Sequence, residues 1–274
     1  MTDQLVNQRF PRSSKYNPDW MLEGPFGGNA VWLCEWLTES LSLKSGMRVL
    51  DLGCGRAKSS IFLANEFDVQ VWATDLWINA TENQQRIEAA GFTDQVFPIH
   101  ADARSLPFAA DFFDAIVCVD AIPYFGTDDL YLNYLAQFVK PNGPIGVAGA
   151  AMMQEFDGGV PEHLTRFWTQ DCWPLHTAEW WRNHWARTGI VSVEVAEPME
   201  RGIDAWKQWN GSMPDPVDWF VETLEQDDGK YLGYFRMVGT RQADVELTEY
   251  NWPDTTKSWP IEFEEKPLLR TDKP

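Results

Sequence analysis

Residues 49–57 read VLDLGCGRA, and this stretch decides which fold the chain adopts. Apolar residues on both sides of an aspartate indicate a buried strand, and the glycines that follow indicate a tight turn into a helix. Asp51 is therefore placed near the end of the strand, where Gly53 and Gly55 let the backbone approach a ligand closely. Two common cofactor-binding folds begin in this way, and the residues around the turn distinguish them.

The sequence around this turn alternates between strand and helix patterns. Helical patterns cover 29–42, 58–67 and 79–91. Strand patterns occur at VQVWATD, QVFPIHA, AIVCV and PIGVAGA, and IVSVEVAEP and YLGYFRMVGT are expected to form an edge pair. This alternation predicts an α/β fold with a doubly wound, mostly parallel sheet and helices on both faces.

The pattern divides the chain into three parts. Residues 1–29 are expected to form an N-terminal tail and lid, because the first half is polar and aperiodic and the second half is aromatic and glycine-rich. Residues 30–240 form the main domain, with a tryptophan-rich, substrate-facing addition at 151–229. Residues 241–274 are expected to form a C-terminal tail.

Composition excludes several kinds of partner. Asp and Glu total 41 against 22 Lys and Arg, so a formal net charge of −19 repels nucleic-acid phosphates, and we expect no nucleic-acid partner. The four cysteines lack metal-binding spacing, and we expect no metal site. The N-terminus lacks a secretory pattern and no segment approaches the roughly 20 apolar residues that span a bilayer, which predicts a cytoplasmic protein without membrane insertion. The oligomeric state is not predicted.

The position after the glycine turn separates two classes of cofactor. A dinucleotide-binding turn needs a third glycine where the helix packs against the strand, and this chain has Lys58 there. Asp51 would also face the pyrophosphate of a dinucleotide with like charge, whereas its carboxylate suits a cationic ligand. S-adenosylmethionine carries an ammonium group and no phosphate, so these residues favour it over NAD.

With these residues identified, VLDLGCGRAKSS resembles the first motif of class I S-adenosylmethionine-dependent methyltransferases, and the chain resembles small-molecule members of the ubiquinone and tocopherol type. The resemblance covers about residues 30–150 and includes FFDAIVCVDA and FVKPNGPIGV. It implies a Rossmann-like, seven-stranded fold and S-adenosylmethionine as cofactor. The chain departs from the family at Ala57, where a glycine is usual, and in the basic residues Arg56 and Lys58.

The resemblance also implies which residues bind the cofactor. Asp75 would accept hydrogen bonds from both ribose hydroxyls, with capping of the next helix as its alternative role. Asp102 would contact the adenine amine, with a turn as its alternative. Asp51 is expected to approach the ammonium group and Lys58 the carboxylate. The predicted cofactor residues are Asp51, Gly53, Gly55, Lys58, Asp75, Leu76, Asp102 and Ala103.

Candidate catalytic residues follow the strand AIVCV. Asp120 and Tyr124 lie where the methyl group would be transferred, although a solvated loop carboxylate is an equally favoured interpretation of Asp120. The candidate acceptor contacts come from the lid and the tryptophan-rich region, where helical spacing indicates that most tryptophans pack in the core. These contacts are Tyr16, Trp20, Met21, Glu23, Trp180 and Trp181.

The sequence therefore predicts an enzyme that transfers a methyl group from S-adenosylmethionine to a small molecule. Because the chain is acidic and the acceptor region is aromatic, an amine or a neutral aromatic or prenylated compound is the expected acceptor. One alternative is a regulatory or sensor protein that binds S-adenosylmethionine without turnover. A less favoured alternative is an NAD-dependent oxidoreductase.

Overall fold

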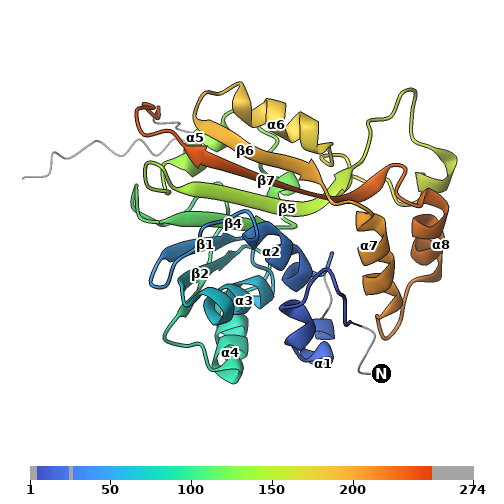
Figure 1. Ribbon diagram of the computed structural model, residues 1–274, viewed down its shortest axis with the longest axis horizontal. Helices are drawn as coiled ribbons and strands as arrows, with labels where there is room; N and C mark the ends of the chain where they lie inside the picture. The colour runs from blue at the N-terminus through green and yellow to red at the C-terminus, as the bar shows by residue number, and fades with distance from the viewer. Residues whose placement is uncertain (1–4, 25–26, 249–274) are drawn as a thin grey trace, which may run out of the picture.

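A computed structural model describes residues 5–24 and 27–248, which contain one seven-stranded sheet (Figure 1). Its strands are β1 (Arg48–Leu52), β2 (Gln70–Asp75), β3 (Val96–His100), β4 (Ala115–Val119), β5 (Pro144–Met152), β6 (Val191–Pro198) and β7 (Leu232–Arg241). They lie in the order β3-β2-β1-β4-β5-β7-β6. β7 is antiparallel to its neighbours β5 and β6, whereas β1 to β5 pair in parallel. The predicted mostly parallel sheet and its late edge pair are confirmed.

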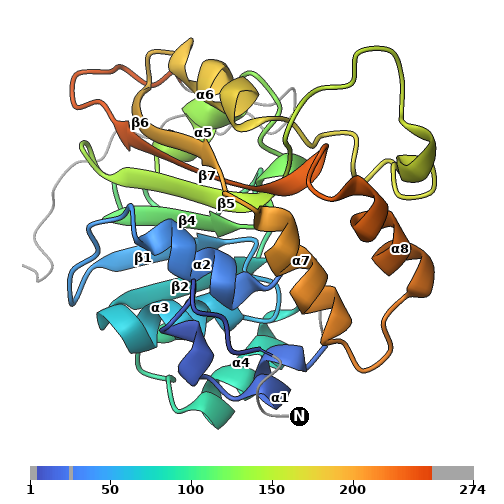
Figure 2. The same ribbon diagram turned by 45° about the vertical axis from the view of Figure 1, so that its right-hand side comes forward.

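Helices cover both faces of this sheet (Figures 1 and 2). They are α1 (Pro18–Leu22), α2 (Ala30–Thr38), α3 (Lys58–Phe67), α4 (Ala80–Ala90), α5 (Tyr131–Ala136), α6 (Ala178–Ala186), α7 (Gly202–Gly211) and α8 (Asp218–Asp227), with short 3₁₀ turns η1 (Ser13–Lys15), η2 (Ile122–Tyr124) and η3 (Glu162–Leu164). Side chains of α2, α3, α4 and α7 pack in one apolar cluster, and those of α5 and α6 pack in another. The predicted doubly wound arrangement is confirmed.

The central strands are apolar because both of their faces are covered. All five residues of β4 are buried, and β1 is buried from Val49 to Leu52. Parallel strands between two layers of helices characteristically read as continuous apolar runs. Asp51 is the polar exception in β1, and its carboxylate must therefore find partners inside the protein.

The predicted substrate-facing addition at 151–229 divides into two parts. α6 and β6 belong to the main domain, since α6 packs on β6 and β7. The loop after β5, together with η3, α7 and α8, extends beyond one end of the sheet (Figure 1), and we call these elements the cap. Within the cap, α7 packs on β7 and α8 packs on α7. The prediction that the whole range faces the substrate is wrong for α6 and β6, because strand pairing places them at the sheet edge.

The N-terminal residues are packed against the domain. Leu5 and Phe10 are fully buried, and the Phe10 ring stacks on Trp32 with 5.3 Å between ring centroids. The prediction of a loose tail is therefore wrong for the described residues 5–15. Burial of these two apolar side chains removes enough surface from water to hold the segment in place.

Most of the predicted C-terminal tail, from residue 249 on, lies outside the described residues. Before it, the side chain of Asn133 donates to the carbonyl of Thr248, which holds this segment against α5. No helix within 5–24 and 27–248 combines the length and the apolar character needed to cross a bilayer.

A buried carboxylate anchors the N-terminal segment to α2. Glu35 accepts hydrogen bonds from the backbone N–H of Arg12 at 2.9 Å, and from the N–H and hydroxyl of Ser13 at 2.6 and 2.5 Å. Ser13 is completely buried, so water cannot replace this acceptor.

Replacing Glu35 by alanine should lower the free energy of unfolding by about 3 kcal/mol, because it leaves buried donors without an acceptor. Urea denaturation measures this loss. The matched control is Glu39→Ala, which removes an exposed carboxylate at the end of the same helix that pairs with Arg236. Such a surface pair contributes less than about 1 kcal/mol. Equal losses in the two variants would contradict the anchoring role of Glu35.

Candidate functional site

A first cavity of about 380 Å³ opens where β1, β2 and β4 end. Leu52, Asp75 and Val119 bring the carboxyl ends of these strands to its wall. In open α/β sheets this edge is the usual place for a ligand, because the loops that follow the strands can shape a crevice there. The sequence-predicted turn after β1 forms part of the same wall.

The glycine turn is held tightly against its neighbours. Gly53 adopts a left-handed conformation with φ of +73°, and a Cβ atom at this position would lie 2.4 Å from the Cβ of Ala121. Its N–H donates to the carbonyl of Thr74 at 2.8 Å, which ties the turn to β2. Ala57, at the position of the usual third glycine, also has positive φ. Alanine keeps the turn at a strain of about 1–2 kcal/mol.

Asp51 lies behind the cavity wall. Its carboxylate is completely buried, and one oxygen accepts hydrogen bonds from the hydroxyls of Ser59 and Ser60, both at 2.6 Å. Burial raises the pKa of Asp51 to about 6, although the two serine hydroxyls oppose the shift. Ser59 lines the cavity and Asp51 does not. The sequence predicted that Asp51 contacts the ligand directly. In the structure, Asp51 does not line the cavity.

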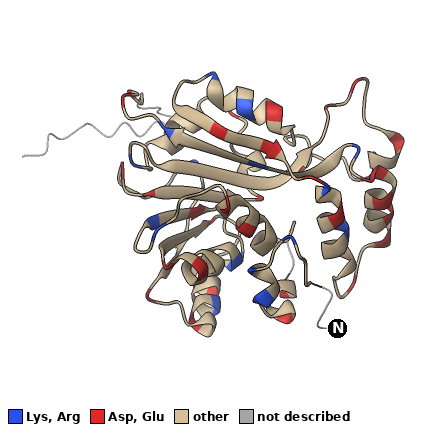
Figure 3. Ribbon diagram, viewed as in Figure 1, with Lys and Arg blue, Asp and Glu red and all other residues tan. Residues whose placement is uncertain are grey.

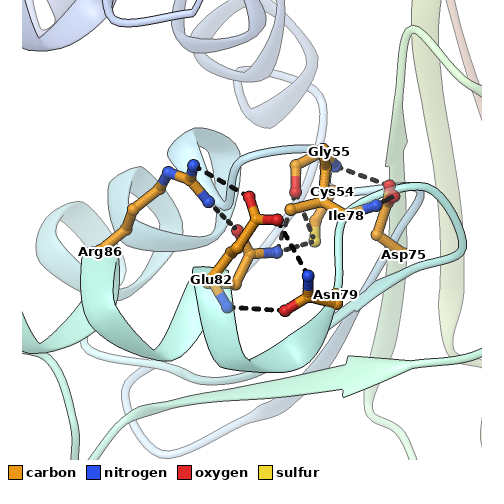
Figure 4. A network of polar contacts seen from close by, with 8 residues as sticks. Cys54, Gly55, Asp75, Ile78, Asn79, Glu82 and Arg86 are labelled. Atoms are coloured by element: carbon orange, nitrogen blue, oxygen red, sulfur yellow. Dashed lines mark hydrogen bonds and ion pairs between the residues drawn. The ribbon is translucent and has the colours of Figure 1, made fainter.

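Asp75 joins the two loops that enclose the cavity (Figure 4). One carboxylate oxygen accepts from the N–H of Gly55 at 2.8 Å, and the other accepts from the N–H groups of Trp77 and Ile78, also at 2.8 Å. The carboxylate lines the cavity. The N-cap of α4 is Asn79, so the alternative role of Asp75 as the cap of this helix is not observed.

Two basic side chains from the glycine turn line the same cavity. The ammonium group of Lys58 donates to the carbonyl of Met21, and burial lowers its pKa to about 8, with the cations Arg56 and Arg86 acting in the same direction and Glu23 against it. The buried Nε of Arg56 has no hydrogen-bond partner within the described ranges. In a chain with a net charge of −19, these two cations give this part of the cavity a local positive charge.

The remaining predicted cofactor residues lie around the far part of the cavity. Asp102 forms an ion pair with Arg104 at 2.7 Å, and the hydrogen bond from Arg104 lowers the pKa of Asp102. Ala103 is buried, and its carbonyl accepts from the hydroxyl of Tyr131 at 3.0 Å. Leu76 is exposed at the mouth. The structure therefore brings all the predicted cofactor residues except Asp51 to one cavity.

Asp120 follows β4 and adopts a left-handed conformation with φ of +56°. Its carboxylate accepts from the N–H of Gly28 at 2.8 Å and from the N–H of Ala150 at 2.9 Å. Burial raises the pKa of Asp120, and the two N–H groups partly oppose this shift. Tyr124 stands beside it with an exposed ring that meets Trp77 at 5.2 Å between centroids. The interpretation of Asp120 as a freely solvated loop residue does not fit these contacts.

A second cavity, of about 560 Å³, adjoins the first. Gly27, Gly28, Asp120 and Tyr124 line both cavities, so the two spaces meet at these four residues. The other lining residues come mainly from the cap: Pro123, Ala150, Phe167, Asp171, Cys172, Leu175, Trp206, Asn210, Met213, Pro214, Asp215, Pro216, Val217 and Phe220. None of the described residues on its wall is basic, and most are apolar or aromatic.

Of the acceptor residues predicted in the lid, only Met21 lines a cavity among those described. Met21 lines the first cavity, and exposed Glu23 acts on Lys58 through its charge. Tyr16 and Trp20 line neither cavity, and their rings stack on each other with 5.6 Å between centroids. These two side chains fasten the N-terminal segment to the domain, because the Tyr16 ring also packs on Phe62 of α3.

Trp180 and Trp181 are likewise absent from both cavities. Trp181 is fully buried and stacks on Phe235 of β7, with centroids 5.8 Å apart. Trp180 stacks between the imidazole rings of His176 and His184. This placement disagrees with the prediction that these tryptophans contact the acceptor, because α6 packs on the sheet. Their helical spacing indicated a packing role in the core, and this interpretation agrees with the structure.

Several lining residues carry no role in the sequence prediction. Trp206 and Trp209 belong to the tryptophan-rich region, but the pattern does not show that α7 turns them toward the cavities. Gly27 and Gly28 are visible as a glycine pair, yet their contact with Asp120 joins distant parts of the chain. Arg56 is visible as an unusual basic residue in the glycine turn.

Comparisons with known proteins agree with this geometry. Residues 49–143 match the sequence family of methyltransferase domains. The chain is 29% identical over 158 residues to methyltransferase GfsG of Streptomyces halstedii, a match that covers 57% of each protein. The chain spans about half the length of the first curated relatives that it matches.

Solved structures with the same fold include phosphoethanolamine N-methyltransferase 2 of Haemonchus contortus in complex with S-adenosyl-L-methionine. It superposes with a TM-score of 0.65 at 16% identity, covering 87% of this chain and 61% of that one. The [4+2]-cyclase SpnF superposes with a TM-score of 0.60 at 16% identity, covering 80% of this chain and 84% of that one. The match to methyltransferase domains covers residues 49–143, and these superpositions confirm the predicted Rossmann-like fold.

The raised pKa of Asp51 predicts a pH dependence of stability. Between pH 4 and 6 the folded protein keeps a proton that the unfolded chain has released, so the stabilising contribution is present at low pH and is lost as pH rises through about 6. In Asp51→Asn this loss is absent. The free energy of unfolding of this variant should therefore rise relative to the wild type by about 2 kcal/mol between pH 4 and pH 7.

Urea denaturation across this pH range measures the difference between the two proteins. Asp94→Asn, which changes an exposed aspartate, is the control and should run parallel to the wild type. A parallel profile for Asp51→Asn would mean that Asp51 is not protonated in the folded state near pH 5.

Proposed function

We propose that this chain, which carries a class I S-adenosylmethionine-dependent methyltransferase domain, transfers the methyl group of S-adenosylmethionine to a small molecule held in the second cavity. The observation that carries the proposal is the meeting of two cavities at Asp120 and Tyr124. One cavity has the polar residues that suit the donor, and the other is mostly apolar. A donor and an acceptor placed on either side of this junction would face each other for the transfer.

The residues of the first cavity fit S-adenosylmethionine. The unpartnered Nε of Arg56 and the ammonium group of Lys58 offer donors to the carboxylate of the ligand. Asp75 and Asp102 both line this cavity, and their carboxylates can accept hydrogen bonds from the ribose hydroxyls and the adenine amine respectively. When bound, S-adenosylmethionine supplies a methyl group on a sulfonium, which a nucleophile can attack in line.

Asp120 is the residue best placed to accept a proton from the acceptor. Its two hydrogen bonds from Gly28 and Ala150 fix the carboxylate at the junction of the cavities. Burial raises its pKa toward the working range of a general base. Tyr124 borders the same junction and helps to close the first cavity through its contact with Trp77.

The second cavity favours a neutral or cationic acceptor with an apolar body. Phe167 and Phe220 stack at 5.5 Å between centroids, and the ring of Trp206 packs against both in a T-shaped arrangement. Asp171 and Asp215 add negative charge at exposed positions on its wall. Acidic residues are also frequent in neighbouring α8, which is coloured largely red and tan in Figure 3. A phosphorylated acceptor, as named for the phosphoethanolamine methyltransferase, would find no cation among the described residues of this wall.

The alternative role of a sensor without turnover needs a donor site alone. The second cavity and its contact with Asp120 favour turnover, since a sensor has no need of an acceptor space next to the donor. The fold by itself does not decide the reaction, because the similar structure of SpnF is that of a cyclase.

S-adenosylhomocysteine at 100 times its dissociation constant should stabilise the folded protein by about 2.7 kcal/mol through mass action. Asp75→Ala should weaken binding at least tenfold, because the charged hydrogen bonds to the ribose contribute about 1.5–3 kcal/mol each. Calorimetric titration measures both affinities, and Asp94→Ala at an exposed site is the control. Unchanged affinity in a folded Asp75→Ala protein would remove Asp75 from the donor site.

Acceptors that differ only by a carboxylate test the chemistry of the second cavity. The wild type should show at least a tenfold higher kcat/KM for the uncharged or amine member, and the difference should narrow at high ionic strength. Asp215→Asn should reduce the difference in kcat/KM between the two acceptors. Glu88→Gln, the control, makes the same change in net charge on remote α4 and should leave that difference unchanged. Preference for the acidic member would refute the electrostatic argument.

A further inference from the structure

One peptide unit connects the cap to the junction of the two cavities. The carbonyl of Gly27 accepts a hydrogen bond from the indole Nε1 of Trp209 at 3.1 Å. The N–H of the same peptide, that of Gly28, donates to a carboxylate oxygen of Asp120 at 2.8 Å. Because a peptide unit is planar, an indole that holds its carbonyl also fixes the direction of its N–H.

We propose that Trp209 is a positioning residue, which holds the Gly27–Gly28 peptide so that its N–H points at the Asp120 carboxylate. The inference rests on the proposed function, because Trp209 affects the reaction only through Asp120. The two hydrogen bonds share one polarisable amide, so the indole strengthens the N–H as a donor as well as aiming it. Trp209 itself transfers no proton.

The space around the peptide supports this role. A Cβ atom at Gly27 would lie only 2.3 Å from the Asp120 oxygen, so the peptide lies directly against the carboxylate. Trp209 is only 2% exposed, which protects its hydrogen bond from water. α7 also places Trp206 and Asn210 on the wall of the second cavity. The helix that would contact an acceptor thus also holds the peptide at the catalytic carboxylate.

The other groups that face Asp120 do not replace this N–H. Tyr124 after β4, Tyr234 on β7 and Cys118 on β4 interact with it electrostatically, and burial raises the pKa of all three, so they are neutral near pH 7. Ala150 in β5 supplies the second backbone donor. Within the described residues, these two N–H groups are therefore what stabilises the negative charge of Asp120.

Trp209→Phe should raise the pKa of Asp120 by about half a unit or more, because a less well aimed N–H stabilises the carboxylate less. Carbon-13 NMR of aspartate-labelled full-length protein bound to S-adenosylhomocysteine measures this pKa, with Asp120→Asn assigning the signal. The acid limb of the kcat profile should move by the same amount, and kcat should fall more than the KM of the acceptor rises.

Trp32→Phe is the matched control. Trp32 packs against Trp209 with 6.3 Å between centroids, and its buried indole N–H has no hydrogen-bond partner in the described part of the chain. Trp32→Phe removes the same side-chain volume and an indole N–H as Trp209→Phe does, and it should leave the pKa of Asp120 unchanged. An equal shift in both variants would overturn the proposal.

A measurement on the wild type does not depend on the folding of any variant. In nitrogen-15 spectra, the indole signal of Trp209 and the amide signal of Gly28 should both follow the titration of Asp120. If the Trp209 signal ignores that titration, the proposal is wrong. If NMR shows the coupling and the pKa shift while kcat is unmoved, Trp209 positions Asp120 as proposed and the assignment of Asp120 as the base fails instead.

Discussion

Backbone N–H groups around the carboxyl edge of the sheet need acceptors, and two aspartates at this edge supply them. Asp75 at the end of β2 accepts from three N–H groups in two loops. Asp120, directly after β4, accepts from two N–H groups in widely separated segments. Each carboxylate therefore fixes the walls of a cavity while staying available to a ligand. The rest of the site depends on this arrangement, since the glycine turn, the N-terminal segment and the cap all meet at these two side chains.

The contrast between the two cavities follows from which elements supply them. The turn after β1 contributes the cations Arg56 and Lys58 to the first, and the cap contributes aromatic rings to the second. The chain has a net charge of −19, and these two cations line the cavity proposed for the donor. Among the described residues, the wall of the cavity proposed for the acceptor has no basic side chain. Such a division favours a zwitterionic donor on one side and an apolar, uncharged or cationic acceptor on the other.

The alternation of strands and helices could be predicted from local pattern, and with it the place of Asp75 at a strand end. The cofactor roles of Asp75 and Asp102 came instead from the resemblance to the methyltransferase family, and the order of the strands was not predicted. Asp51 could not be placed in the same way. It also lies near a strand end, but the serines of α3 that enclose it are known only when the helix has packed. The two tryptophans Trp181 and Trp209 show the same limit. The packing of α6 places Trp181 in the core, whereas the packing of α7 places Trp209 on the wall of the first cavity. Hydrophobic periodicity predicts that a helix forms, but it does not show which element each of its side chains will contact.

A crystal structure of the full chain with S-adenosylhomocysteine tests most directly whether the two cavities are a donor site and an acceptor site. The account predicts that the adenosine lies beside Asp75 and Asp102, the carboxylate meets Arg56 and Lys58, and the sulfur faces Asp120 at the junction. The second cavity should remain free of this ligand. A ligand bound in the second cavity, or one whose sulfur points away from Asp120, would contradict the account.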